Sequence, residues 1–304
     1  MRLALLALAL GLGLGIPAQA QDAELGVRYW YSSAKSTRSH NAQSVDARLG
    51  NPTSVLTYTN LDAHALELHG RKSFAGDWFV KGNAGLGTIT GGSLRDEDFN
   101  VGQVRDTDTT STVKGNGLRY ASIDFGRELW RFENGTAGLF VGYHYWRERV
   151  DAYGVVSILG STPIVLIPDS VPAITNETTW QSLRIGLAAA ARVGPQTRFA
   201  FDAAFVPYAH LRDEDSHWLR QDASAGPFFL GPAPNIHIEG AGYGFQFEFE
   251  LRHTLQAAWE LGAGLRYWWL RSEDGTRKAL GTSVPIIEIE SQRVGIMLSL
   301  TRRW

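Results

Sequence analysis

The sequence contains no cysteine, so neither a disulfide nor a thiolate site contributes to its structure or chemistry. Beyond its first residues it has no apolar run near the roughly 20 residues that a spanning helix needs, which excludes membrane insertion by helices. Nor does charge of one sign dominate. With 29 basic and 31 acidic residues the formal charge is −2, which argues against a nucleic-acid partner. The chain is instead rich in glycine and aromatic residues (33 Gly, 10 Trp, 10 Tyr and 14 Phe), which suits strands, tight turns and aromatic belts.

The amino-terminal segment has the parts of a secretory signal. Arg2 precedes an apolar run at residues 3–16, and Ala18-Gln19-Ala20 fits the small-x-small cleavage pattern. The run is too short to span a membrane as a helix. We therefore expect residues 1–20 to be a cleaved signal peptide and residues 21–304 to form one mature domain.

Apolar and polar residues alternate along many segments of the mature chain. Near the carboxyl end, Val294, Ile296, Leu298 and Leu300 share one parity, and polar or small residues share the other. This is the pattern of strands whose lipid-facing and lumen-facing side chains alternate. The segments that show it are Leu25–Ala34, Val55–Arg71, Trp78–Thr90, Leu118–Leu129, Gly138–Val150, Thr178–Ala191, Arg198–Leu211, 243–252, 259–269 and 293–304.

About ten such strands, with no helical segment between them, predict an all-β fold: a single antiparallel transmembrane β-barrel. Closure removes the sheet edges that lipid cannot satisfy. The connections support this prediction because they alternate between short turns and long loops, as periplasmic turns and extracellular loops do. The predicted turns centre on residues 75–77, 133–135, 194–196 and 254–258, and the predicted loops are Lys35–Ser54, Gly91–Gly117, Asp151–Glu177, Arg212–Ile238 and Asp274–Glu288. We expect both termini on the periplasmic side of a bacterial outer membrane.

Several charged residues have the parity of the lumen, where they would form ion pairs that fill a narrow barrel. The acidic members are Asp62, Glu67, Asp124 and Asp202, and the basic ones are Arg119, Arg184 and Lys81. The residues His64, His69, His144 and His253 are interpreted as polar groups of the lumen or of the membrane interface, not as ligands.

Two acidic clusters fall on the same outer rim, Asp96-Glu97-Asp98 after the third strand and Asp213-Glu214-Asp215-Ser216-His217 after the seventh. In an extended segment residues two apart share a face, so Asp96 pairs with Asp98, and Asp213, Asp215 and His217 point together. A water held between such groups can act as a nucleophile, with the histidine as base. Solvated acids, or acids on a cation, are the simpler interpretation. A bulge at Gly91-Gly92 or at Pro207 would change the parity.

At these residues the sequence resembles the omptins, ten-stranded proteases of the bacterial outer membrane. That family carries a D-x-D pair on the second outer loop and D-x-D-x-H on the fourth, and Asp96-Glu97-Asp98-Phe99 and Asp213–Trp218 match both motifs. The resemblance implies that Asp96 and Asp98 hold the water and that Asp215 and His217 form the catalytic dyad, His217 being the base. Asp213 would bind a basic substrate side chain. Omptins pair this acid with a glutamate of the first loop, but here residues 33–38 contain no acid and the first is Asp46.

Omptins also need lipopolysaccharide for activity, and Tyr143 and Arg147 resemble part of its binding site. An aromatic belt with a snorkelling arginine explains this pair equally well. The resemblance thus implies an aspartic-type endopeptidase that acts on peptides or proteins at the cell surface, without a metal or an organic cofactor. One alternative is a non-catalytic adhesin or binding barrel, which the apolar stretch 158–172 supports. Another is a small diffusion pore, although about ten strands enclose little space for a channel.

Overall fold

The computed structural model describes residues 23–256 and 258–304, so the predicted signal peptide and its cleavage site lie outside the described residues. Within those ranges no helix is long and apolar enough to cross a membrane. The structure consists of strands joined by turns and short 3-10 helices. The strands are β1 (Ala23–His40), β2 (Leu49–Ser73), β3 (Trp78–Asn100), β4 (Val104–Val113), β5 (Asn116–Phe132), β6 (Gly135–Ser157), β7 (Ile164–Arg192), β8 (Thr197–His217), β9 (Ile236–Gln256), β10 (Trp259–Ala279) and β11 (Thr282–Arg303).

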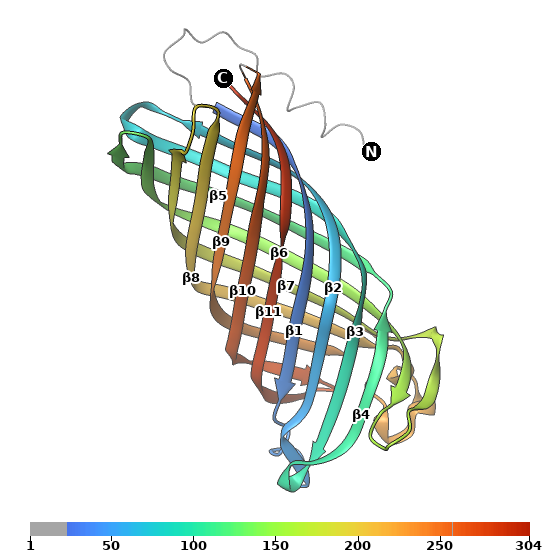
Figure 1. The fold of residues 1–304 in the computed structure, drawn as a ribbon. Helices are drawn as coiled ribbons and strands as arrows, with labels where there is room; N and C mark the ends of the chain where they lie inside the picture. The colour runs from blue at the N-terminus through green and yellow to red at the C-terminus, as the bar shows by residue number, and fades with distance from the viewer. Residues whose placement is uncertain (1–22, 257) are drawn as a thin grey trace, which may run out of the picture.

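These eleven strands form one antiparallel sheet that closes on itself, because β1 pairs with both β2 and β11 (Figure 1). The strands β4 and β5 share one position in the ring. Each of them pairs with β3 on one side and β6 on the other, and only residues 114–115 separate them. Eleven strands therefore make a ring of ten positions. The structure confirms the predicted antiparallel barrel of about ten strands.

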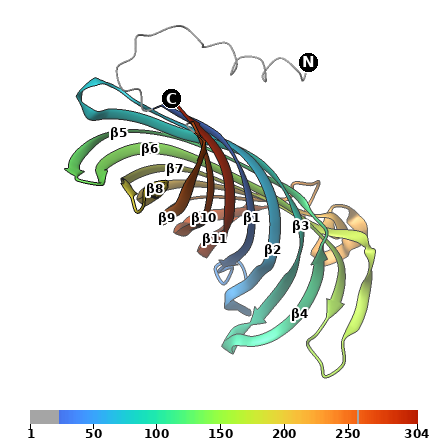
Figure 2. The ribbon, with the colours of Figure 1, turned by 45° about the horizontal axis from the view of Figure 1, so that its top comes forward.

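The two ends of the barrel differ, as Figure 2 also shows. Short connections such as the 3-10 turn Ala75–Asp77 lie at the end where β1 begins and β11 ends, and outer-membrane barrels carry their short turns on the periplasmic side. At the other end the strands run on into the segments that the sequence predicted as long loops. The predicted loops were too long, because the connections between strands at this end are only residues 41–48, 101–103, 158–163, 218–235 and 280–281. The barrel wall itself thus extends well beyond the membrane.

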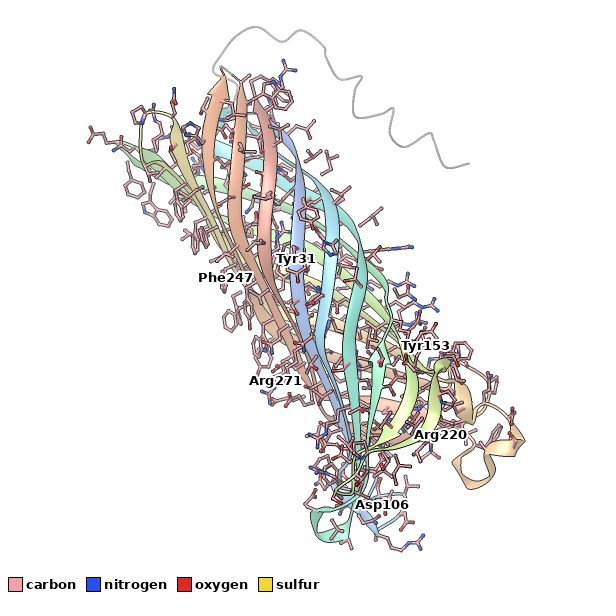
Figure 3. All side chains as sticks on the ribbon, turned by 45° about the vertical axis from the view of Figure 1, so that its right-hand side comes forward. Tyr31, Asp106, Tyr153, Arg220, Phe247 and Arg271 are labelled. Atoms are coloured by element: carbon pink, nitrogen blue, oxygen red, sulfur yellow. The ribbon has the colours of Figure 1, made fainter. Side chains whose placement is uncertain are left out.

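The outer surface of the barrel carries an apolar belt. Leu66, Leu86 and Ile123 are between 61% and 70% exposed. Aromatic side chains such as Phe247, on β9, also project outward (Figure 3). So large an exposed apolar surface would be unfavourable in water but matches the hydrocarbon of a bilayer. The fold and this belt place the chain in the bacterial outer membrane.

A layer of aromatic side chains fills the lumen at mid-height. Trp268 is its centre, with ring centroids 4.8 Å from Trp30, 5.0 Å from Tyr120, 4.7 Å from His144 and 5.5 Å from Trp146. Trp30 is fully buried and Trp146 and Tyr120 nearly so. Rings in contact at these distances fill this part of the lumen with packed side chains, which disfavours the pore alternative.

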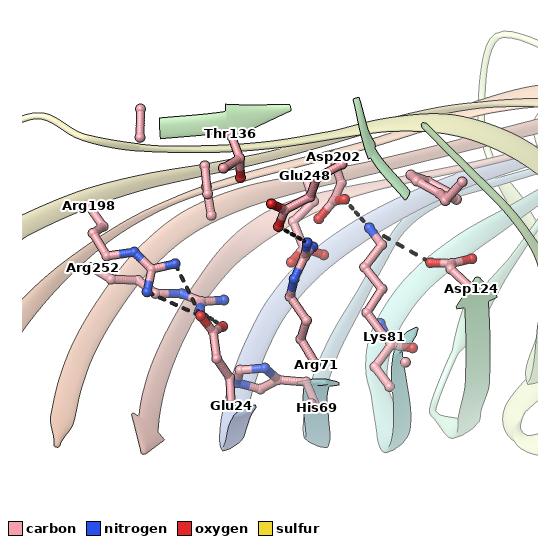
Figure 4. A pocket seen from close by; sticks show the side chains of 18 of the residues that line it. Glu24, His69, Arg71, Lys81, Asp124, Thr136, Arg198, Asp202, Glu248 and Arg252 are labelled. Carbon is pink, nitrogen blue, oxygen red and sulfur yellow. Dashed lines mark hydrogen bonds and ion pairs between the residues drawn. The ribbon is translucent and has the colours of Figure 1, made fainter. Parts of the chain in front are cut away.

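Below the aromatic layer the lumen is charged. Arg266, fully buried, pairs with Glu67 at 2.6 Å and with Glu248 at 2.7 Å, and Arg28 reaches Glu67 at 2.5 Å. Towards the periplasm lies a cavity of about 580 Å³, which is lined by Trp268 and by residues of further ion pairs. Figure 4 shows some of these ion pairs. Those pairs include Arg252–Glu24 at 2.7 Å.

The predicted ion-pair network exists, with corrections to its membership. Asp124 pairs with Arg184 at 2.5 Å and with Lys81 at 3.8 Å, and Lys81 also contacts Asp202. Asp62 and Arg119 do not join the network, because their side chains do not face the lumen. The adjacent residues Leu61 and Leu118 face it instead. Of the four histidines, His69 and His144 are buried in the lumen, whereas His64 and His253 lie on the outer face.

Candidate active site

Two bulges determine which way the acidic clusters face. Along β3 the buried residues up to Ile89 have odd numbers, whereas the one buried residue after Gly91-Gly92, Leu94, has an even number. Gly92 has φ +148°, and a Cβ there would lie 2.8 Å from Leu61 Cδ2. This conformation and the close contact both require glycine. The bulge turns the residues that follow it to the opposite face of the sheet.

The second bulge lies in β8 at Pro207-Tyr208. Three steps along β8, from Val206 to Ala209, match two steps along the neighbouring β9. The same offset appears against β7 on the other side, so the extra residue belongs to β8. Without it the last residues of β8 would face outward. Both bulges that the sequence left open are therefore present, and each directs its cluster into the barrel.

The first cluster divides between the two faces of β3. Asp98 Oδ2 accepts a hydrogen bond of 2.8 Å from Thr107 Oγ1 on β4, and Asp96 Oδ1 lies 3.5 Å from Ser54 Oγ on β2. Glu97, between them, faces outward and pairs with Arg105 at 2.8 Å. The predicted pairing of Asp96 with Asp98 on one face is confirmed, and Glu97 plays no part inside the barrel.

The second cluster is more deeply buried. Asp213, Asp215 and His217 are 0%, 4% and 8% exposed, whereas Glu214 faces outward and pairs with Arg212 at 2.5 Å. The amide of Asn176, on β7, donates to Asp213 Oδ1 at 2.9 Å and to Asp215 Oδ1 at 2.7 Å. The side-chain amide of Asn176 thus fixes the positions of the Asp213 and Asp215 carboxylates relative to each other.

A side-chain amide also positions His217, the last residue of β8. Asn235 Oδ1 accepts from the backbone N–H of His217 at 3.0 Å, and Asn235 Nδ2 donates to its carbonyl oxygen at 3.2 Å. Sequence reasoning missed both Asn176 and Asn235. Asn176 could have been found by continuing the alternation of the seventh strand outward, but Asn235 lies in a loop and carries no such signal.

The two clusters interact electrostatically across the lumen, beyond the apolar belt. Burial and the neighbouring charge of Asp98 raise the pKa of Asp96 to about 7, and the charge of Asp215 on the other wall raises it further. Burial and the charge of Asp213 raise the pKa of Asp215 to about 7 as well. Both carboxyl groups therefore change protonation near neutral pH, where a catalytic carboxyl group is useful.

Two arginines add positive charge to the same space. Burial, together with the charges of Arg220 and Arg277, lowers the pKa of His217 to about 3, so its imidazole is neutral at pH 7. Arg277, on β10, interacts with Asp215, Asp98 and Asp96. Arg277 belongs to no recognised sequence motif, which is why sequence reasoning did not identify it.

The environment of Asp213 differs from the one that the resemblance implied. Its Oδ2 accepts from Arg38 Nε at 3.0 Å, and Arg38 extends from β1 across the lumen. Asp46, the first acid of the first outer loop, does not supply the expected partner, since it lies within that loop and pairs with Arg48 at 2.7 Å. Arg38 was visible in the sequence, because the even parity of Trp30, Ser32 and Ala34 continues to it.

Tyr143 and Arg147 lie apart from this site, on the outer face of β6. The hydroxyl of Tyr143 donates to Gln181 Oε1 at 2.9 Å, and Arg147 pairs with Glu177 at 2.5 Å. They are therefore near the membrane and not near the lumen. Among residues 23–256 and 258–304 no group of three or more histidine, aspartate and glutamate side chains is arranged to hold a metal ion.

The architecture matches a solved outer-membrane enzyme. The outer membrane protease OmpT of Escherichia coli superposes with a TM-score of 0.73 over 94% of this chain and 99% of that chain, at 13% sequence identity. The chain has the omptin fold. Likeness at this identity establishes the fold and not the activity.

The other comparisons add little to the omptin fold. No protein-family model matches the sequence, and no curated protein matches it. The attachment invasion locus protein Ail of Yersinia pestis covers 93% of this chain and 98% of its own, at 8% identity, but its TM-score of 0.32 is too low for any argument.

Proposed function

We propose that this barrel is an omptin-like endopeptidase of the outer membrane. One observation carries the proposal: the carboxyl groups of the half-buried Asp96 and the buried Asp215 belong to different walls of the barrel, both have a pKa of about 7, and the neutral His217 follows two residues after Asp215. Buried carboxyl groups that share a space and resist ionising together are typical of acid–base sites. The aromatic layer below closes the lumen, so substrate reaches these groups from the cell exterior.

In the proposed reaction, Asp96 and Asp98 hold a water molecule while His217 takes one of its protons. The water oxygen forms a bond to the carbonyl carbon of the substrate, the carbon–nitrogen bond breaks, and His217 returns the proton to the leaving nitrogen. The products are a carboxylic acid and an amine, and no oxidant or metal takes part. Asp215 lies on the same face of β8 as His217 and, when ionised, stabilises the imidazolium that forms transiently.

The test compares inward with outward acids of the same clusters. Protein refolded with lipopolysaccharide is assayed against a varied peptide library, and Asp98→Asn and His217→Ala are compared with Glu97→Gln and Glu214→Gln. We expect the inward substitutions to reduce kcat/KM by roughly 10³-fold or more, as loss of a general base or of its partner does, and the outward ones to leave it unchanged. Heat-modifiable electrophoretic mobility verifies that each variant is a folded barrel.

Absence of cleavage by correctly folded wild type would refute the proposal, as would equal losses in the inward and outward variants. Because the residues named above supply all the proposed chemistry, a chelator should leave cleavage unchanged. Chelator-sensitive cleavage would contradict this proton-transfer scheme.

The proposal includes a requirement for lipopolysaccharide, bound at the outer face by Tyr143 and Arg147. Arg147 carries a positive charge that Glu177 partly balances, and both side chains are about one-quarter to one-third exposed. Arg147→Ala should then raise the concentration of lipopolysaccharide needed for half-maximal cleavage, whereas Arg149→Ala should not. Cleavage that is independent of lipopolysaccharide would remove this part of the proposal.

A second candidate function, binding without catalysis, rests on the hairpin between β6 and β7. This hairpin projects beyond the barrel at its outer end (Figure 1), and Leu159, Ile164, Val165 and Leu166 in it are 49–67% exposed. Exposed apolar clusters of this kind mark contact surfaces. If the wild type cleaves nothing, surface adhesion that depends on this hairpin becomes the favoured function.

A further inference from the structure

Arg38 connects opposite walls of the barrel. It belongs to β1, and its guanidinium group reaches residues of β7 and β8, which lie halfway around the ring. Its Nε donates to Asp213 Oδ2 at 3.0 Å, and its Nη2 donates to Thr178 Oγ1 at 2.5 Å and to Asn176 Oδ1. No other basic side chain forms an ion pair with Asp213 among the described residues.

Both carboxylate oxygens of Asp213 accept hydrogen bonds within this arrangement. Its Oδ1 accepts from Asn176 and its Oδ2 from both Arg38 and Thr178, at 2.5 to 3.0 Å. The ion pair is closed to solvent: the side chain of Arg38 is 7% exposed and that of Asp213 is 0% exposed. Above the pair the guanidinium carbon lies 5.0 Å from the ring centroid of Tyr58, which is itself fully buried.

We propose that Arg38 permanently occupies the pocket that Asp213 forms, so that the protein does not accept arginine or lysine before the bond that it cleaves. This inference rests on the proposed function and names its substrate class: peptides with a small, uncharged residue at that position. A second cationic side chain would meet the charge of Arg38 in a space that Arg38 and Tyr58 fill, and it would find Asp213 already paired.

The physical part of the proposal is tested without any activity. Arg38→Ala removes the guanidinium group and leaves a space beside an anionic Asp213, and millimolar methylguanidinium serves as the probe. We expect the probe to bind this variant saturably and to raise its unfolding temperature with the concentration dependence of a single site. Wild type and the double variant Arg38→Ala/Asp213→Asn should show no such rise. A single variant that behaves like these two controls would overturn the proposal.

The specificity part is tested with paired peptides that differ only in having arginine or alanine before the bond cut. Wild type should cleave the alanine peptide and discriminate against the arginine peptide, whereas Arg38→Ala should shift the ratio of the two kcat/KM values towards arginine by about tenfold or more. Wild type that prefers the arginine peptide would overturn the inference. If no variant cleaves anything, the proposed function fails, and the binding experiment still decides whether Arg38 occupies a cation pocket.

Arg38→Ala leaves a buried carboxylate without its partner, so folding is monitored by heat-modifiable mobility. Should the variant fail to fold alone, its refolding yield is measured with and without methylguanidinium. The proposal then requires that the probe restore folding of Arg38→Ala, and no restoration overturns it. Arg38→Ala/Asp213→Asn, which removes both charges, shows whether the backbone tolerates the smaller side chain.

Discussion

Asp96 and Asp215 belong to different walls of the barrel, yet the charge of Asp215 contributes to the raised pKa of Asp96, after burial and the charge of Asp98. The two residues are 119 positions apart in sequence (215 minus 96), and only closure of the sheet brings them together. Each carboxyl group makes ionisation of the other less favourable, so the site binds a proton at a pH where isolated aspartates have lost theirs.

The first prediction concerns stability as a function of pH. The folded-state pKa values of Asp96 and Asp215, about 7, lie above the value near 3.9 of an unfolded aspartate. The folded state therefore binds more protons between these values. The resulting stabilisation is fully present below about pH 4 and is lost as the pH rises through about 7.

Asp96→Asn/Asp215→Asn should consequently lose less stability than wild type between pH 5 and pH 8. The difference should be on the order of a few kcal/mol, since one pKa unit corresponds to about 1.4 kcal/mol. Urea unfolding followed by tryptophan fluorescence measures it, with Glu97→Gln as the control. Parallel pH dependences of wild type and double variant would contradict the raised pKa values.

The second prediction concerns Arg277, whose positive charge lowers the pKa of Asp215 and that of His217. Arg277→Gln removes this charge and should raise both pKa values. The rising limb of kcat/KM against pH should move upward by roughly half a unit to one unit. Lys278→Gln, at the exposed neighbouring position, is the matched control and should leave the profile in place. An unshifted profile for Arg277→Gln would show that Arg277 does not tune the site.

The third prediction concerns the bulge that turns Asp96 and Asp98 inward. Gly92→Ala places a Cβ 2.8 Å from Leu61 Cδ2 at a φ of +148°, whereas a Cβ on Gly91 meets nothing within 4 Å. The Gly92 variant should lose on the order of 1–3 kcal/mol of stability. It should also lose activity, because the acids that follow the bulge are displaced. Gly91→Ala should stay near wild type in both measurements, and similar effects at the two positions would exclude this role of the bulge.

The fourth prediction concerns the charged layer below the aromatic one. Glu67 lies within 2.6 Å of both Arg28 and Arg266, and all three are buried. Glu67→Gln leaves two buried guanidinium groups short of negative charge and should cost about 3–5 kcal/mol of stability. Asp46→Asn, which breaks the exposed pair with Arg48, should leave the urea midpoint unchanged. A small effect of Glu67→Gln would mean that Glu248 and Glu250 balance the cluster without it.

Much of the fold was predictable because a strand repeats every two residues and a membrane leaves little choice of architecture. The alternation from Val294 to Leu300 identified a lipid-facing wall, and the order of short and long connections gave the orientation. The extent of the strands was not predictable. β7 begins at Ile164, inside a predicted loop, because strands above the membrane have no apolar face that must meet lipid, so the alternation fades while the backbone pairing continues.

The candidate site was predicted in part. That Asp96 shares a face with Asp98, and Asp213 with Asp215, follows from local geometry alone. Whether those faces point inward depends on the bulges at Gly91-Gly92 and Pro207-Tyr208, and a bulge exists only relative to the strand paired beside it.

The sequence by itself determined the class of the protein, the approximate number of its strands, and the pairs of acids that share a face, since these depend on neighbours along the chain. Only the tertiary structure decided that the two clusters face one lumen and that Arg38 joins Asp213 across it. The reason is that contacts across a barrel depend on the register and closure of all its strands, and no short stretch of sequence contains that information.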